Sequence, residues 1–454
     1  MCGITGVYAP GHESARLAFF ALYALQHRGQ ESAGIAAADG GTIRSHKDMG
    51  LLGAIFDEDI LSRLSGSIAV GHTRYSTTGS SIVVNAQPLL ERSDIGDFAF
   101  AHNGNLTNTD ELRATLSPSL TLMATSDSEV MAKLLVEAEG TMLERIGSVL
   151  RRARGAYSIV LCTESELYAF RDPWGVRPLC LGTYGEGGYA VASESCALQT
   201  IGATFVRELE PGEIVRIGKH GLESVKSAVP QRQALCMFEY IYFARPDSQL
   251  NHQSIYMARY RMGEQLAREH PVEADVVIAV PDSAMPGGMG YANESGLPFV
   301  EGLIKNRYIG RTFISPDQTM RSRGVQLKFN PVVENLRDRR VIVVDDSIVR
   351  GTTTPRIVQL LRDAGAREVH VRITSPPIKH PCYLGVDMAT YDELIAANYT
   401  VEEIGKKIGA DSLGYLSLDG LIESTERKRE DMCLGCLTGT YPNVPATHKP
   451  RAAV

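Results

Sequence analysis

The sequence predicts two domains of different fold class: an α+β domain with antiparallel strands, followed by an α/β domain with a parallel sheet. The first half contains short alternating segments and turns, at residues 35–48, 67–79, 97–108 and 158–170, which are typical of antiparallel strands. After about residue 235, short β-rich runs at 275–280, 299–304, 340–344 and 368–373 alternate with helical or loop stretches, which indicates a parallel sheet. A length of 454 residues agrees with two or three domains.

We expect the domain boundary near residues 228–234, so that the domains span residues 2–234 and 235–440, with residues 441–454 as a loose tail. In the first domain, one helix is expected over Ala15–His27. A second is expected to begin at Ser126, with Ser126 and Glu129 as a capping box, and to stop before Gly140.

The composition is that of a soluble globular protein, with 44% hydrophobic and 22% charged residues. A net charge of −7 gives no sign of nucleic acid or an anionic membrane as a partner. The apolar run Leu17–Leu25 is too short to span a bilayer and has no basic segment before it, so a cytoplasmic protein is expected. Eight cysteines in such a chain favour catalysis or metal binding over a disulfide scaffold.

The most informative segment of the second half is Val341–Thr354. A buried strand is expected to end at the carboxylates Asp345 and Asp346, followed by a loop of small and hydroxyl residues. A helix is then expected, with Thr354 as N-cap and Pro355 at its first position. The apolar face of that helix comprises Ile357, Leu360 and Leu361, and Gly365 ends it.

This arrangement places an anion site beside a site for a cation or sugar hydroxyls. Free N–H groups at a helix start, with threonine hydroxyls, bind phosphate, and adjacent carboxylates favour a cation or a diol. Together they suit a ribose 5-phosphate, whereas a P-loop is excluded because G-x-x-x-x-G-K-[ST] is missing here. The alternative is a segment without a binding role, in which a buried strand is followed by a polar turn. The segment resembles the phosphoribosylpyrophosphate (PRPP) motif of type I phosphoribosyltransferases, in which the acids contact the ribose and Mg²⁺.

Cys2 follows Met1 directly. Removal of the initiator methionine would leave one residue that carries both a thiol and an α-amine of unperturbed pKa ~8, which can serve as nucleophile and base. A chance small residue after Met1 is the alternative. Four segments favour a catalytic Cys2 over a chance residue. Together they resemble N-terminal-nucleophile (Ntn) glutamine amidotransferases: residues 2–7, 25–30, 71–75 and 102–106.

This resemblance implies an αββα sandwich and assigns roles in glutamine hydrolysis. The Cys2 thiolate attacks the glutamine amide, and Asn103 with the Gly104 N–H forms the oxyanion hole. Arg74 binds the substrate carboxylate and Asp127 its ammonium group, while Arg28 either contacts glutamine or supports the site. Structural roles are expected for the three histidines of these motifs, His27, His72 and His102.

Both halves together resemble the family of glutamine phosphoribosylpyrophosphate amidotransferases, in which released ammonia displaces pyrophosphate from PRPP to give 5-phosphoribosylamine, the first step of purine synthesis. The family's pyrophosphate loop corresponds to residues 280–283, and its flexible loop, which closes over PRPP and helps to form an ammonia channel, to residues 305–314. The sequence of residues 284–288 differs from the one usual in this family. One Mg²⁺ would be held by Ser283, Asp345 and Asp346. The expected PRPP-binding residues are Asp345, Asp346, Ser347, Arg350, Gly351, Thr352, Thr353, Lys305 and Tyr308.

Cys433 and Cys436 form a C-x-x-C pair, for which zinc, iron–sulfur and redox roles all compete on spacing alone. One branch of the family carries a structural [4Fe–4S] cluster, and its four ligands match Cys236, Cys382, Cys433 and Cys436. Zinc or free thiols are the alternatives, and Cys162, Cys180 and Cys196 are expected in the core. Members of that branch often have a cleaved leader, so either no leader exists here or the sequence begins after it.

The resemblance also implies a homotetramer and feedback inhibition by purine nucleotides, with Lys305 and Arg307 as candidates for a nucleotide site. Glucosamine-6-phosphate synthases and asparagine synthetases share the first domain, but the PRPP motif argues against both. A non-catalytic PRPP-sensing regulator with a cluster is the alternative of another class, and the presence of Cys2, Arg74, Asn103 and Asp127 argues against it.

Overall fold

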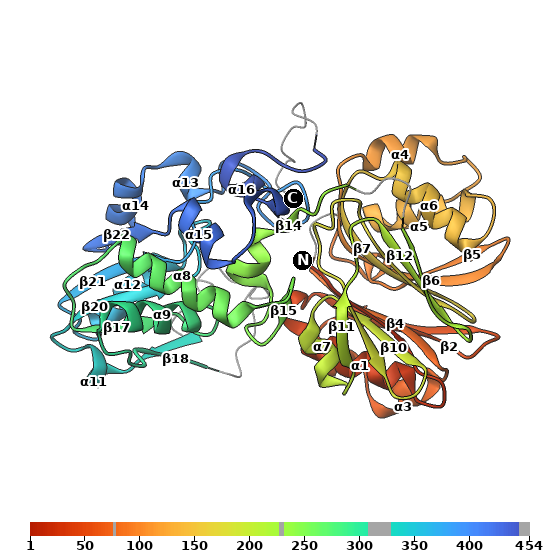
Figure 1. The fold of residues 1–454 in the computed structure, drawn as a ribbon, viewed down its shortest axis with the longest axis horizontal. Coiled ribbons are helices and arrows are strands. Elements are labelled where there is room, and N and C mark those ends of the chain that lie inside the picture. Colours follow the sequence, from red (N-terminus) through yellow and green to blue (C-terminus); the bar gives the residue numbers. More distant parts are fainter. Residues whose placement is uncertain (76–78, 227–230, 307–327, 445–454) are drawn as a thin grey trace.

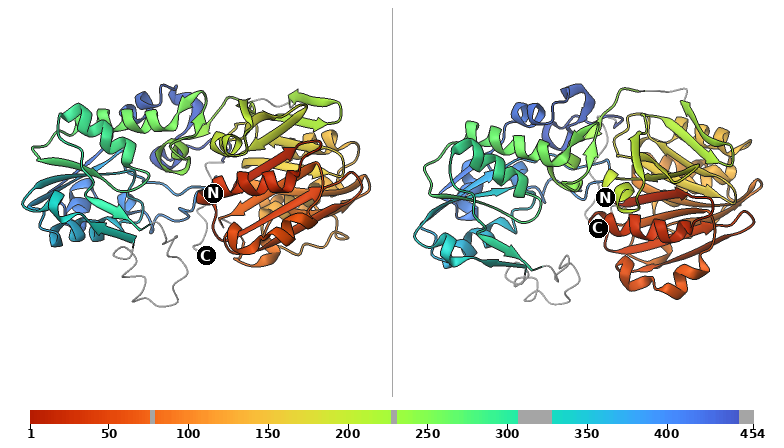
Figure 2. Two further views of the ribbon diagram at one scale, coloured as in Figure 1. Left: turned by 90° about the horizontal axis from the view of Figure 1, so that it is seen from below. Right: turned by 60° about the horizontal axis from the view of Figure 1, so that its bottom comes forward.

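The computed structural model describes residues 1–75, 79–226, 231–306 and 328–444. It consists of two halves of different architecture, and the N-terminus lies where they meet (Figure 1). Figure 2 shows the same division from two other directions. Among the described residues, no helix has both the length and the apolar character needed to cross a bilayer.

The first half is a sandwich of two antiparallel sheets. The seven-stranded sheet has the spatial order β11 (Thr204–Glu208), β9 (Cys180–Tyr184), β10 (Gly188–Ala192), β1 (Gly3–Tyr8), β4 (Ile68–Arg74), β2 (Ser32–Ala38), β3 (Ile43–Met49). The six-stranded sheet has the order β13 (Gly221–Lys226), β12 (Glu213–Gly218), β8 (Leu167–Arg171), β7 (Gly155–Thr163), β6 (Gly96–Leu106), β5 (Leu89–Ser93). Their facing sides form one apolar core that includes Ile4, Val70 and Val160.

Helices cover both outer faces, which completes the predicted αββα sandwich. The helices on the seven-stranded sheet are α1 (Ser14–Ala24), α2 (Leu52–Ile55), α3 (Glu58–Arg63) and α7 (Ser195–Thr200). Those on the six-stranded sheet are α4 (Thr109–Thr115), α5 (Asp127–Glu137) and α6 (Met142–Arg152). Short 3-10 turns occupy Gln26–Arg28 and Val83–Asn85.

Two details of the predicted helices are wrong. The helix expected over Ala15–His27 ends at Ala24, and a 3-10 turn then carries His27 and Arg28. Ser126 is the N-cap of α5, but within the described part of the chain its side chain makes no cap hydrogen bond. The Glu129 carboxylate instead accepts the N–H groups of Met123 and Ala124, both at 2.7 Å, so the capping box does not form.

The second half contains the predicted parallel sheet, in the order β17 (Val276–Ala279), β20 (Arg340–Asp345), β21 (Glu368–Ile373), β22 (Ser412–Tyr415). The run at residues 299–304 was expected to be a further strand of this sheet. It makes only an isolated parallel bridge between Phe299 and Val277. Its end forms β18 (Leu303–Lys305), which pairs antiparallel with β19 (Phe329–Pro331).

The helices of this half are α8 (Ile255–Glu269), α9 (Met285–Ser295), α11 (Val333–Leu336), α12 (Thr354–Asp363), α13 (Ile395–Asn398), α14 (Val401–Ile408), α15 (Leu418–Ser424) and α16 (Gly435–Thr438). The N-cap of α12 is Thr353, one residue earlier than expected. Helices α8 and α9 touch through glycines: a Cβ on Gly263 would lie 1.8 Å from the Gly287 carbonyl oxygen. The glycines at 287 and 288 therefore have a packing role.

The two halves are joined by short elements and loops. Strand β14 (Leu235–Cys236) pairs in parallel with β23 (Met432–Cys433), which brings the two ends of the second half together. Two short strands, β15 (Gln249–Leu250) and β16 (Gln253–Ser254), and a π-helix over Glu239–Phe243 follow β14. A 3-10 turn covers Arg429–Asp431. The expected boundary near residues 228–234 lies partly outside the described residues.

Candidate active sites

Cys2 lies just before β1, at the junction of the two halves. Its main-chain N–H donates to Oδ1 of Asn103 at 3.1 Å, and its thiol donates to the Tyr75 carbonyl oxygen at 3.6 Å. The Met1 side chain is buried next to it, where Arg177 contacts the sulfur. The thiol is half-buried, which keeps a nucleophile ordered and still accessible.

Asn103 and Gly104 lie on β6, which pairs with β7. Because Oδ1 of Asn103 is used by Cys2, its Nδ2 group remains as a donor, and it is buried with no partner among the residues that the structure describes. A buried amide donor without an acceptor is costly. An oxyanion that develops next to Cys2 would supply that acceptor. Position 104 requires glycine, since a Cβ there would lie 2.0 Å from the Ala156 carbonyl oxygen.

Arg74 and Asp127 are the expected glutamine ligands. Arg74 ends β4 and is 3% exposed; its guanidinium pairs with Glu31 and donates to the Ser80 carbonyl at 3.2 Å. Asp127 begins α5, and its Oδ2 accepts the Leu106 N–H at 2.9 Å. Both side chains are thus held in fixed directions. Glu31 was not predicted, because it is 43 residues away from Arg74 along the chain and no local motif links the two.

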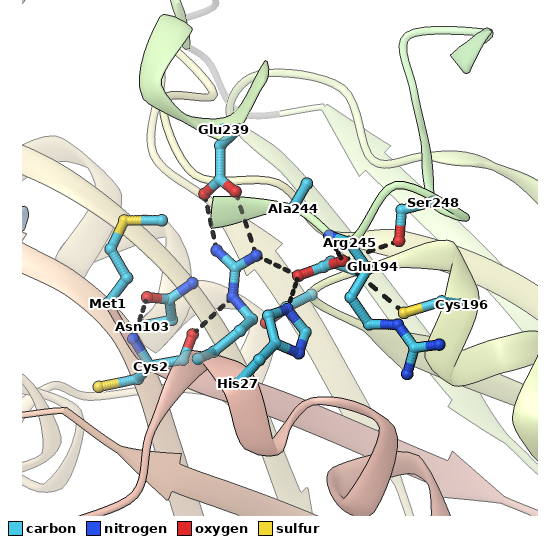
Figure 3. A network of polar contacts seen from close by, with 12 residues as sticks. Met1, Cys2, His27, Asn103, Glu194, Cys196, Glu239, Ala244, Arg245 and Ser248 are labelled. Atoms are coloured by element: carbon cyan, nitrogen blue, oxygen red, sulfur yellow. Dashed lines mark hydrogen bonds and ion pairs between the residues drawn. The ribbon is translucent and has the colours of Figure 1, made fainter. Parts of the chain in front are cut away.

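The Arg28 side chain is held by groups of the chain itself, as expected of a residue that supports the site. Its Nε donates to the Cys2 carbonyl at 3.1 Å, and its two terminal nitrogens bind the carboxylates of Glu194 at 2.5 Å and Glu239 at 2.7 Å. All three side chains are fully buried. Figure 3 shows Glu194 and Glu239 on either side of this point, with Cys2 and Asn103 close by. The guanidinium is therefore already occupied, which favours the supporting role over a contact with glutamine.

The three histidines are structural in their contacts. Burial, and secondarily the Arg74 charge, lower the pKa of His72 to about 3, and burial lowers the pKa of His102. His102 Nδ1 shares a hydrogen bond with Ser128 at 2.9 Å, and His27 pairs with Glu194 at 2.7 Å. The lowered pKa values of His72 and His102, together with these contacts, agree with the structural roles expected for them.

The second site is at the carboxyl end of β20, as the sequence predicts. Asp346 is 6% exposed, and its carboxylate accepts from Ser283 at 2.5 Å and from Ser347 at 2.6 Å. Burial, and then the Asp346 charge, raise the pKa of Asp345 well above its usual value. Burial also raises the pKa of Asp346, although both serines oppose this. One buried carboxylate, one half-buried carboxylate and a hydroxyl are the kind of oxygen donors that Mg²⁺ prefers.

The loop after β20 offers an exposed cradle. Thr352 and Thr353 are exposed, and Gly351 has φ +67°, a left-handed conformation that favours glycine. Arg350 does not face this cradle freely, because it pairs with Glu393 at 2.5 Å and with Asp387 at 3.6 Å. The structure thus leaves the serine, glycine and threonines of the loop as the available anion contacts.

The loop expected to bind pyrophosphate, residues 280–283, contacts the end of β20. The peptide bond between Pro281 and Asp282 is cis, and the Ser283 hydroxyl donates to Asp346. Lys305 pairs with Asp282 of this loop. Tyr308 and Arg307, together with the rest of the expected flexible loop after residue 306, lie outside the described residues. The buried Arg259 behind Asp346 was not predicted, because nothing in its local sequence distinguishes it.

The four cysteines expected to bind a cluster gather at the domain junction. Cys236 and Cys433 are direct partners in the β14–β23 pair. The main-chain N–H groups of Leu384 and Val386 donate to the sulfur of Cys382, both at 3.4 Å. The Cys436 carbonyl accepts from Lys379 and His380 at 3.1 Å, which ties the C-x-x-C segment to the Cys382 loop.

Three of these four cysteines are buried. Within the described ranges, no group of three or more His, Cys, Asp or Glu side chains is arranged so that it could hold a metal ion. Burial raises the pKa of Cys236 to about 11 and that of Cys433 and Cys436 further, while the charge of Arg177 stabilises the thiolate form of Cys236. The other buried cysteines, Cys162, Cys180 and Cys196, lie in the first half, as predicted.

Comparison with known proteins finds the same two domains in the chain, one for glutamine and one for phosphoribosyl chemistry. A glutamine amidotransferase domain model matches residues 72–200, and a phosphoribosyl transferase domain model matches residues 247–404. The chain is 52% identical to an amidophosphoribosyltransferase of Synechococcus elongatus, over 97% of this chain and 91% of that protein. It is 51% identical to that of Archaeoglobus fulgidus, over 97% and 98%.

Solved structures agree with this likeness. A glutamine phosphoribosylpyrophosphate amidotransferase from B. subtilis, complexed with ADP and GMP, superimposes with a TM-score of 0.93 at 44% identity and covers 99% of both chains. A second structure, described as the allosteric regulatory enzyme of purine biosynthesis, gives a TM-score of 0.92 at 45% identity over 98% of this chain and 96% of the other.

Proposed function

This chain belongs to the amidophosphoribosyltransferase family, and we propose that Cys2, Asn103 and Gly104 perform its glutamine chemistry while Asp345 and Asp346 organise its PRPP chemistry. The enzyme converts PRPP and glutamine into 5-phosphoribosylamine, glutamate and pyrophosphate, the first step of purine biosynthesis. One observation supports the residue assignment most: the buried Nδ2 donor of Asn103, free of partners in the described part of the chain, lies on the side chain that already holds Cys2.

In the glutamine half-reaction, the Cys2 sulfur attacks the side-chain amide carbon. The α-amine of Cys2, exposed once Met1 has been removed, takes the thiol proton and delivers it to the leaving nitrogen. Asn103 Nδ2 and the Gly104 N–H donate to the oxyanion. Ammonia leaves, a γ-glutamyl thioester remains, and water releases glutamate. Arg74 pairs with the α-carboxylate of the substrate and Asp127 with its ammonium group.

In the PRPP half-reaction, ammonia attacks C1 of the ribose and pyrophosphate leaves. Asp345, Asp346 and Ser283 would hold Mg²⁺, which would supply positive charge close to the pyrophosphate group. The carboxylates also accept hydrogen bonds from ribose hydroxyls, while Ser347, Gly351, Thr352 and Thr353 contact the 5-phosphate. We propose Lys305 and Tyr308 as further PRPP contacts, in a loop that closes over the substrate and encloses a path for ammonia between the sites.

For the four junction cysteines we propose one [4Fe–4S] cluster with a structural role. Three observations support it: the cysteines come from segments far apart in sequence, they meet beside Arg177, and two main-chain N–H groups already point at Cys382 sulfur. Hydrogen bonds to ligating sulfur and a nearby cation are common features of such sites. A cluster here would tie β14, the Cys382 loop and the C-x-x-C segment into one unit.

Regulation and assembly are proposed by analogy. The B. subtilis relative was solved with ADP and GMP, so we propose purine nucleotides as feedback inhibitors of this enzyme, with Lys305 and Arg307 as candidate contacts. We also propose a homotetramer, and a location in the cytoplasm. Phe20 and Tyr23 on α1 are exposed by 46% and 62%, which suits a surface that is covered in an oligomer.

The decisive experiment measures pyrophosphate release from PRPP and Mg²⁺ in anaerobically purified protein, with glutamine and separately with ammonium. The Cys2→Ala variant should lose glutamine-dependent release and glutamate formation and retain ammonium-dependent release. If the variant keeps both activities unchanged, Cys2 is not the nucleophile. If the parent protein uses ammonium alone, the PRPP site works and Cys2 is blocked, most simply by retained Met1.

A further inference from the structure

A carboxylate from the second half of the chain supports the nucleophile of the first. Glu239 is 0% exposed and begins the π-helix Glu239–Phe243, next to the domain junction. Its carboxylate accepts two hydrogen bonds from Arg28, at 2.7 and 3.1 Å. Single-turn π-helices are rare and frequently mark functional sites. Glu239 was not among the site residues predicted from sequence.

The contact reaches Cys2 through one guanidinium. Arg28 uses its terminal nitrogens for Glu239 and Glu194, and its Nε for the Cys2 carbonyl. A planar guanidinium held at both ends has no freedom to rotate, so the direction of its Nε–H is fixed. That N–H fixes the main chain of Cys2 at the residue that carries the nucleophile. In Figure 3, Glu239 lies above Cys2 and Glu194 lies to the right of it, and both carboxylates point toward the centre of the network.

Glu239 is itself anchored to the second half. Arg259, on α8, donates from Nε to the Tyr240 carbonyl and from a terminal nitrogen to the Ala244 carbonyl, both at 2.8 Å. Arg259 is 2% exposed, so these bonds lie in a dry interior. They hold both ends of the π-helix against α8. The Glu239 carboxylate therefore keeps its place relative to the PRPP domain, and Cys2 is oriented partly from there.

We propose that Glu239 is a positioning residue for the glutamine half-reaction, acting through Arg28 on the Cys2 main chain. This rests on the proposed role of Cys2 and extends it. A thiol, its own α-amine and the Asn103 donor must converge on one carbon atom. Misplacement of a nucleophile by about 1 Å can cost about 100-fold in rate. The second half-reaction has no such requirement, because ammonium supplied in solution bypasses Cys2.

The test compares Glu239→Gln with the parent enzyme in the holoenzyme form. The variant keeps the size of the side chain and removes its charge, so one of the two hydrogen bonds from Arg28 to residue 239 is lost. We expect a decrease of about 10- to 100-fold in kcat with glutamine, with a smaller change in the KM for glutamine. Ammonium-dependent activity should stay within about twofold. Alkylation of Cys2 by the glutamine analogue 6-diazo-5-oxo-norleucine should slow by a similar factor to kcat. The rate of this alkylation reports the reactivity of Cys2 itself.

Glu208→Gln is the matched control, because Glu208 is also a buried acid at the junction. It pairs with Arg171 at 3.6 Å and accepts the Asn251 N–H, and neither partner contacts Cys2. This variant should lower the unfolding temperature without changing the ratio of the two activities. Glu239→Asp, with a shorter carboxylate, should give an intermediate ratio, and it replaces Glu239→Gln if the latter does not fold.

Two results would overturn the proposal. One is an unchanged glutamine activity and alkylation rate in Glu239→Gln. The other is an equal loss of both activities together with the fall in unfolding temperature, since that describes a structural residue only. Failure of the underlying function is a separate result, because it would appear in the parent enzyme as missing glutamine-dependent release.

Discussion

Oδ1 of Asn103 accepts a hydrogen bond from the Cys2 main-chain N–H at 3.1 Å, which leaves the Nδ2 group of the same amide buried and pointing elsewhere. In the proposed reaction this one side chain has two tasks: it holds the main chain of Cys2, and it keeps a donor for the negative charge that the attack would create. The free energy lost by burying that donor without an acceptor would be regained when the oxyanion forms.

Replacing Asn103 by Ala should therefore impair the chemical step rather than substrate binding. We expect kcat with glutamine to fall by about 100- to 1000-fold, the measured range for loss of one oxyanion donor, with little change in the KM for glutamine. Steady-state kinetics of glutamate release check this, and ammonium-dependent activity is the internal control. A change in KM alone would assign Asn103 to substrate binding instead.

The acidic pair at the second site predicts a pH dependence of PRPP binding. Burial and the Asp346 charge raise the pKa of Asp345, and the protonated form cannot bind Mg²⁺. PRPP affinity should be complete above this raised pKa and should weaken by up to about tenfold per pH unit as the pH falls through it. The KM for PRPP in the ammonium-dependent reaction, measured at several pH values, reports this.

The Asp345→Asn variant supplies the control for that measurement, since its KM for PRPP should be higher and should retain only the titration of PRPP itself. In the absence of Mg²⁺, the stability of the protein should change with pH in the opposite direction to the affinity for PRPP. Asp345, with its pKa raised by folding, binds more protons in the folded state, so stability falls as the pH rises from the unfolded to the folded pKa. A stability that increased with pH in this window would contradict the assignment.

The sequence predicted those parts of the sites that are local in the chain. Strand, acids, hydroxyl loop and helix follow one another within Val341–Asp363, so their order alone indicated a phosphate site beside a cation site. Only the N-cap moved, from Thr354 to Thr353, because either threonine can precede Pro355. Cys2, Asn103 and Asp127 were likewise found from short motifs.

What the sequence could not predict are the partners that packing supplies. Glu239 meets Arg28 across 211 residues, and Asp387 meets Tyr75 across 312. Nothing in the flanking residues encodes these pairs, since each depends on how the two halves dock. The same holds for Glu129, which faces the preceding turn rather than Ser126. Sequence motifs therefore led to the proposed reacting groups, whereas the residues that hold those groups in place could be found only in the structure.

The junction cysteines give a third prediction. Cys436→Ser should reduce bound iron from about four atoms per chain toward zero, remove visible absorption and lower the unfolding temperature by several degrees, because three segments lose their common ligand. Iron analysis and anaerobic melting measure this. Cys162→Ala, between the two sheets, is the control: it should cost about 1–2 kcal/mol of stability and leave iron unchanged. Retention of iron in Cys436→Ser would exclude Cys436 as a ligand.

The contact of α8 with α9 gives the last prediction. A Cβ on Gly263 would lie 1.8 Å from the Gly287 carbonyl oxygen, and a main-chain atom cannot move aside as a side chain can. Gly263→Ala should therefore force the helices apart and lower the free energy of unfolding by about 1–3 kcal/mol. Arg259 lies on the same helix, four residues earlier, so the glutamine activity should fall more than the ammonium activity.

Gly147→Ala on α6 separates this steric effect from helix propensity. Its Cβ would meet only the flexible end of Arg151, at 3.4 Å, so the substitution should stabilise the protein by about 0.5–1 kcal/mol. Thermal melting of both variants, beside the two activities, provides the measurement. If Gly263→Ala were as stable as Gly147→Ala, the close approach of α8 and α9 would not hold the π-helix, and the anchoring of Glu239 through Arg259 would lose its support.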